Sequence, residues 1–156
     1  YYLTANGSGL ASENPNLNGN YTVPTDFFIQ FPGRYDVHTV VISVSDNVNF
    51  LQSDYGGITG GLINGIKFFV NINGVEVPLI SAVSIKQNMD WFTIAPGSVL
   101  TSFSNTSQTL IAQFDIEFTF GKPLNLNAGD KFIVRLQDNF TGLVKHTFAL
   151  HGILIV

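Results

Sequence analysis

The stretch 109–120, TLIAQFDIEFTF, decides the fold class of this chain. From residue 113 onward, polar and apolar side chains alternate without a break, as Gln-Phe-Asp-Ile-Glu-Phe-Thr-Phe. Successive side chains of a β-strand point to opposite faces, so this period of two predicts a strand with one buried and one solvated face. The turn residues Gly121-Lys122-Pro123 end it.

Similar short runs, separated by turn residues, occupy most of the chain. Asn73-Gly74 between two such runs is a strong hairpin signal, because both residues tolerate positive φ. No window of helical length shows apolar residues at three- and four-residue spacing, and the β-branched and aromatic content argues against helices. We therefore expect an all-β fold, a single antiparallel jelly-roll sandwich of about eight strands. The further expected strands are residues 26–31, 35–44, 66–72, 75–77, 83–85, 91–94, 131–136 and 147–156.

The composition excludes several classes of protein. Charged residues make up 12% of the 156 residues and hydrophobic residues 45%, so the surface must rely on uncharged polar and apolar groups. A net charge of -4, with seven scattered Lys and Arg, gives no basic surface for nucleic acid. No apolar run is long enough for membrane insertion as a helix. The absence of Cys excludes disulfides and thiolate sites.

The first residues differ in composition from the rest. Residues 6–20, NGSGLASENPNLNGN, are rich in Asn, Gly and Ser and nearly lack apolar side chains. Such a composition is typical of a segment that does not pack. We therefore divide the chain into a flexible or extended N-terminal arm, residues 1–22, and a jelly-roll domain, residues 23–156.

The last expected strand is apolar on both faces. Phe148 and Leu150 lie on one face, while Ala149, Ile153 and Ile155 lie on the other. A sandwich strand normally turns one polar face to solvent, so the second apolar face predicts burial against a neighbouring subunit. Loops of the same chain covering it are the alternative. The expected subunit-interface residues are Phe28, Phe69, Ala149, His151, Ile153 and Ile155.

Two segments near the end carry a resemblance to a known family. Residues 124–132, LNLNAGDKF, and 148–155, FALHGILI, are similar to the last strands of the tumour necrosis factor and complement globular-head superfamily. Phe148 and Gly152 are separated by three residues here, against one in the usual family pattern. The resemblance covers about the last 35 residues, and it implies a jelly-roll homotrimer with the terminal strand near the subunit interface. Similar heads occur on viral fibres and phage receptor-binding proteins.

Asp130 invites a catalytic interpretation, which its position disfavours. Ala128-Gly129-Asp130 directly precedes the apolar run 131–136. We interpret it as the turn that begins a core strand, and we expect its carboxylate to accept backbone N–H groups there.

Other polar residues give no clear sign of chemistry. Asp115 and Glu117 share a strand face, but a solvated face explains them better than glycoside hydrolysis does. The three histidines are dispersed, and the Asx pairs at 46–47 and 138–139 lack the pattern of a calcium loop. We expect no enzyme activity, no catalytic residue, no metal and no cofactor.

Four residues in or beside loops are candidates for contacts with a receptor or glycan. They combine aromatic rings with Asx side chains, a pairing that suits sugars. Core packing is the favoured alternative for the tryptophan. The candidates are Tyr55, Asn88, Asp90 and Trp91.

These observations lead us to expect a viral or phage structural protein, a capsid, spike or fibre-head jelly roll located in the virion. Its partners would be copies of itself in a homotrimer, other virion proteins and a host surface glycan or receptor. A carbohydrate-binding β-sandwich module is the main alternative, and a secreted cytokine-like or complement-like trimeric head is another.

Overall fold

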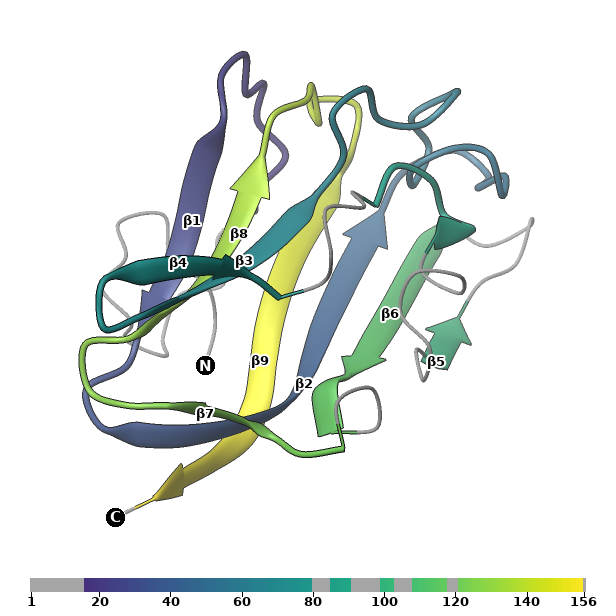
Figure 1. The fold of residues 1–156 in the computed structure, drawn as a ribbon. Helices are drawn as coiled ribbons and strands as arrows, with labels where there is room; N and C mark the ends of the chain where they lie inside the picture. Colours follow the sequence, from purple (N-terminus) through teal and green to yellow (C-terminus); the bar gives the residue numbers. More distant parts are fainter. Residues whose placement is uncertain (1–15, 80–84, 91–98, 103–107, 118–120, 156) are drawn as a thin grey trace.

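A computed structural model of the chain describes residues 16–79, 85–90, 99–102, 108–117 and 121–155. These residues form nine β-strands, and all the pairings between the strands are antiparallel (Figure 1). The strands are β1 (Thr25–Gln30), β2 (Arg34–Ser45), β3 (Lys67–Ile72), β4 (Val75–Pro78), β5 (Val99–Ser102), β6 (Thr109–Asp115), β7 (Leu124–Leu126), β8 (Lys131–Leu136) and β9 (Lys145–Ile155).

The strands make two sheets. The first has the order β1-β8-β3-β4. The second is built around the twelve-residue strand β2, which pairs with β9 over its whole length. The remaining partners of β2 are β6 and β7, and β5 extends the sheet beyond β6. The expected antiparallel sandwich of about eight strands is therefore confirmed.

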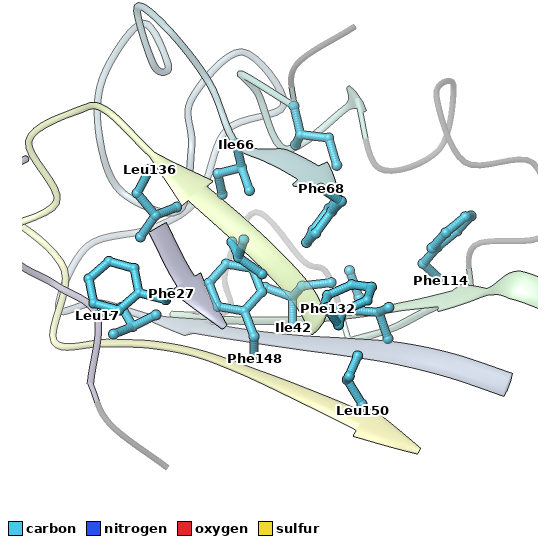
Figure 2. Close-up of a cluster of buried hydrophobic side chains, with 14 of the residues drawn as sticks. Leu17, Phe27, Ile42, Ile66, Phe68, Phe114, Phe132, Leu136, Phe148 and Leu150 are labelled. Atoms are coloured by element: carbon cyan, nitrogen blue, oxygen red, sulfur yellow. The ribbon is translucent and has the colours of Figure 1, made fainter. Parts of the chain in front are cut away.

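The core lies between the two sheets and is rich in aromatic side chains (Figure 2). Every second residue of the central strands points inward, which is the reason that the period of two in the sequence predicted the strands. Examples from both sheets, all buried, are Phe27, Ile29, Phe68, Val70, Phe132 and Val134 in the first and Val40, Ile42, Leu110, Phe114, Phe148 and Leu150 in the second.

The Asn73-Gly74 hairpin forms as expected. Asn73 has a φ of 53° and Gly74 a φ of 84°, and β3 and β4 pair across them. The carboxylate of Asp130 accepts the backbone N–H of Asn127 at 2.8 Å and that of Asn73 at 3.0 Å. Asp130 thus joins the turn before β8 to the β3–β4 hairpin, which is the backbone role that the sequence indicated.

The strand boundaries differ from expectation in several places. The strand that begins at Thr109 ends at Asp115, and residues 118–120 lie outside the described residues. Of the expected strand 83–85, Ile85 forms an isolated bridge with Ile66, and residues 83, 84 and 91–94 are not described. The short strands β5 and β7 were not predicted.

Residues 16–21, hereafter the strap, correct the expected N-terminal arm where the structure describes it. The strap runs along the segment 138–146. The Leu17 N–H donates to the His146 carbonyl at 2.7 Å, and the Tyr21 N–H donates to the Asp138 carbonyl at 3.0 Å. Leu17 is 2% exposed and belongs to the core (Figure 2). Leu17, an apolar side chain between two asparagines, anchors this segment in the core.

Candidate interaction surface

The C-terminal half of β9 is exposed although it is apolar. Phe148 and Leu150, in the middle of the strand, are buried in the core. Ile153, Leu154 and Ile155 are 57%, 47% and 39% exposed. Figure 1 shows the yellow strand running past β7 to the C-terminus, so its end lies at the margin of the sandwich. We call residues 151–155 the β9 end.

The backbone of the β9 end is held by β2. Ile153 pairs with Asp36 and Ile155 with Arg34. The register shifts between Val37 and Thr39, so β2 carries an irregularity opposite Gly152. A side chain at position 152 would collide with the Asp36 backbone, and glycine is therefore required there. The β9 end thus has fixed backbone pairing on one edge while its aliphatic side chains face water.

Four of the six expected interface residues lie together on this strand. Ala149, His151, Ile153 and Ile155 occupy alternate positions, which place them on the outward face of the second sheet. Ala149 is half-buried and the other three are exposed. His151, an expected interface residue, is exposed in the single chain.

Phe28 and Phe69 lie elsewhere, on the outward face of the first sheet. The Lys131 ammonium lies 4.5 Å from the centre of the Phe28 ring, and the Arg135 guanidinium lies 4.3 Å from that of Phe69. Both rings are half-buried. Each is therefore covered within the chain by a cation, a favourable contact with the face of an aromatic ring.

Arg135 is held over Phe69 by two acids. Its guanidinium donates to both carboxylate oxygens of Asp26, at 2.6 and 2.8 Å, and to both of Glu76, at 3.1 and 3.0 Å. Hydrogen bonding to Asp26 and Glu76 raises the pKa of Arg135 further above its ordinary value. The charges of this face are matched locally.

The candidate receptor contacts do not form an exposed cluster. Tyr55 is fully buried, and Asn88 is buried with its amide bonded to the backbone of Leu51 and Gly56. Asp90 accepts the N–H groups of residues 86 and 87 in a local turn. Trp91 lies outside the described residues. This corrects the interpretation of Tyr55 and Asn88 as surface residues, since neither offers a side chain to a glycan.

Tyr55 belongs instead to a buried polar pair. Its hydroxyl lies 2.9 Å from Nε2 of His146, a histidine with no exposed surface. The ring of His146 is stacked on Phe140, with centroids 4.7 Å apart. Burial lowers the pKa of His146 to about 4 and raises that of Tyr55 well above its usual value. The only signal of this pair in the sequence is weak: residues 146, 148 and 150 share one face of a strand.

The side-chain oxygens of the Asx pair at 138–139 accept hydrogen bonds from backbone N–H groups. The Asp138 carboxylate accepts N–H groups from Ile63, Asn64 and Gly65 at 2.8 to 3.3 Å. The Asn139 side chain accepts from Thr141. Within the described ranges, no three His, Asp or Glu side chains come together in a way that suits a metal ion. These groups stabilise loops.

One apolar hollow of about 220 Å³ lies beside the β3–β4 hairpin. No carboxylate or imidazole is among its lining residues, so these supply no general acid, general base or metal ligand. The lining residues are Val70, Val77, Pro78, Leu79, Ile116, Lys122, Pro123 and Leu124.

Comparison with known proteins gives no relative. No protein-family model, no curated protein and no solved structure matches this chain. Among the residues that the structure describes, no helix is long and apolar enough to cross a bilayer. The function is therefore argued from the chain's own surface.

Proposed function

We propose that this chain is a non-enzymatic structural protein that works by assembling with copies of itself, as a capsid, spike or fibre-head component of a virus or phage. The observation that carries the proposal is the β9 end, where three consecutive aliphatic side chains face water on a strand of fixed backbone pairing. Exposed aliphatic surface of this kind is stabilised when a second protein surface covers it.

The β9 end would form the apolar centre of a larger contact. A stable interface buries about 800 Å² per partner, more than three side chains supply. The rest would come from the outward face of β9, where Ala149 and His151 lie. With only 12% charged residues, the chain carries few charges that would have to be desolvated at a contact.

A homotrimer is the assembly that we propose. The resemblance of residues 124–132 and 148–155 to trimeric heads implies a terminal strand near the axis, and the β9 end is the exposed apolar part of that strand. Loops distant from β9 would remain available to other virion proteins and to a host receptor.

Measurement of the oligomeric state tests the assembly. We expect light scattering after size-exclusion chromatography to give the mass of a trimer for the unchanged chain. The double variant Ile153→Ser, Ile155→Ser should give a folded monomer, whose unfolding midpoint does not depend on protein concentration. The matched control is Val23→Ser, Ile63→Ser, at positions 64% and 82% exposed, which should remain trimeric.

A monomeric mass for the unchanged chain at high micromolar concentration would reject the assembly. So would a trimer that survives the β9 substitutions. The virion assignment has its own test, immunogold labelling of particles purified from the source culture. Labelled particles separate it from the secreted-head alternative, which shares the trimer. The burial of Tyr55 and Asn88 removes two of the four residues on which the carbohydrate-binding alternative rested.

A further inference from the structure

The strap is held to the body of the protein by hydrogen bonds, by Leu17 in the core and by the Tyr21 ring, which packs against Phe27 and Phe140. Three main-chain hydrogen bonds join it to the segment 138–146, with donor–acceptor distances of 2.7 to 3.0 Å. Two side chains add to them: the Asn16 amide donates to the Val144 carbonyl and its oxygen accepts from the His146 N–H, while the Asn18 amide donates to the Leu143 carbonyl. Asn16 and Asn20 are exposed, so the strap is an outer layer.

Beneath the strap lies the imidazole of His146. Phe140 is stacked on one side of the ring, and Phe148 and Tyr55 meet it edge to face. The backbone carbonyl of Leu17, which belongs to the strap, lies 3.1 Å from Nδ1. The strap therefore covers one side of the His146 ring, and Phe140, Phe148 and Tyr55 cover the others.

The hydrogen bonds fix the protonation of the ring. A carbonyl only accepts, so Nδ1 must carry the proton that is donated to Leu17. Nε2 of the neutral ring is then an acceptor, and it accepts a hydrogen bond from the Tyr55 hydroxyl, with 2.9 Å between the oxygen and Nε2. Both nitrogens of the neutral imidazole have a partner, whereas a second proton on Nε2 would be donated to the Tyr55 oxygen and would leave the Tyr55 O–H without this acceptor.

Among the residues that the structure describes, no charged side chain contacts the ring. Tyr55 is the titratable side chain in contact with it, and desolvation dominates its pKa, opposed only by the bond to the Leu17 carbonyl. The other groups that face the ring from β9, the 138–146 segment and the strap are Phe148, Phe140, Leu17 and Asn16, all uncharged.

We propose that the strap is an acid-released latch, in which a proton on His146 is accommodated by lifting residues 16–21 so that water reaches the imidazolium. The strap is the part that opens because it belongs to neither sheet, and its opening withdraws Leu17 from the core. Phe148 is part of β9, which pairs with β2 along eleven positions, and Tyr55 and Phe140 are core residues.

The pH range follows from the ring's two environments. Burial lowers the pKa of His146 to about 4, while a ring open to water has an ordinary value near 6.5. The open strap therefore binds the proton more readily, and its equilibrium constant for opening rises as pH falls from 6.5 to 4, by about 300-fold at most. Above this range, opening does not depend on His146.

Amide hydrogen exchange tests the latch. The Leu17 and Tyr21 N–H groups are bonded only while the strap is closed. Corrected for intrinsic rates, their protection should fall more than tenfold between pH 7 and pH 4.5, while the amides of β2 stay protected. The variant His146→Gln offers the same donor and acceptor without titrating, and it should abolish the fall. The control His151→Gln, at an exposed histidine of the same strand, should leave it unchanged.

Unchanged Leu17 protection down to pH 4.5 would overturn the latch, as would an equal fall in His146→Gln. If that variant does not fold, the His146 ring protons of the unchanged chain can be titrated by NMR, and their midpoint must coincide with the loss of Leu17 protection. The latch is independent of the proposed assembly, because it should operate equally in the monomeric β9 variant.

Discussion

Gly152 lies against the backbone of Asp36 so closely that a Cβ at position 152 would overlap the Asp36 carbonyl oxygen. Gly152 is paired with Val37, the neighbour of Asp36, next to the point where the β2–β9 register shifts. Backbone atoms yield less easily than the end of a side chain, so this contact fixes the residue type. The pairing that supports the exposed β9 end therefore depends on one glycine.

The variant Gly152→Ala should destabilise the protein and loosen the β9 end. Overpacking against a fixed carbonyl costs about 1–3 kcal/mol. Urea unfolding measures the loss, and hydrogen exchange of residues 153–155 measures the loosening. Gly142→Ala is the matched control, because nothing lies within 4 Å of a Cβ added there. Equal unfolding midpoints for the two variants would contradict the assigned contact.

His146 should make the free energy of unfolding depend on pH. Its pKa is lowered from 6.5 to about 4 in the folded chain, so the unfolded chain binds protons more readily between these values. Stability is then unaffected by this group above pH 6.5 and falls as pH drops toward 4. The difference between these two pKa values sets the largest possible loss, about 3 kcal/mol. Opening of the strap makes the actual loss smaller.

Denaturant unfolding at pH 7 and pH 4.5 measures this dependence. Carboxylates also titrate in this range, so the useful quantity is the difference between the unchanged chain and His146→Gln. The unchanged chain should lose more stability on acidification than this variant. His151→Gln should follow the unchanged chain. Identical acid sensitivity in all three would show that His146 does not contribute.

Removal of the Asp130 carboxylate should weaken two turns at once. In Asp130→Ala, the partly buried N–H groups of Asn73 and Asn127 lose their acceptor, at a cost of about 1 kcal/mol or more. Asp46→Ala is the comparison, because its carboxylate accepts one exposed N–H, from Asn47. Thermal unfolding should show a larger loss of stability for Asp130→Ala than for Asp46→Ala. A loss of assembly with unchanged stability would instead make Asp130 a contact residue.

Arg135→Ala should uncover Phe69 and leave Asp26 and Glu76 unpaired. The expected loss is about 1 kcal/mol, because the ring contact adds to ion pairs that are partly screened by water. Arg34 makes a longer contact of 3.8 Å with Asp36 and is more exposed, so Arg34→Ala should be nearly neutral. Denaturant midpoints at low and high salt distinguish the two arginines.

The strands were predictable because their signals are local. Alternation in 109–120 reports a single buried face, and Asn73-Gly74 adopts positive φ whatever the rest of the chain does. β5 and β7 escaped prediction because strands of four and three residues are too short to show a period.

The role of the loop residues was not predictable, because burial of a loop depends on residues far away in the sequence. Tyr55 stands beside two glycines, as an exposed binding aromatic would. Its buried position is set by Phe140 and His146, 85 and 91 residues further along the chain, which no local pattern links to it. The polar strap was misjudged for the same reason, since Leu17 is buried by partners at the other end of the domain.

The pairing of β2 with β9 also dictates the order in which the domain can be completed. Arg34 and Ile155, partners in one sheet, are separated by almost the entire chain. During synthesis β2 can acquire β6 and β7 first, but one of its edges stays open until β9 has been made. Such long-range closure is slow, and an open sheet edge is prone to pairing with other chains. Substitutions in β9 should therefore reduce the yield of folded protein more than their effect on the stability of the folded protein suggests.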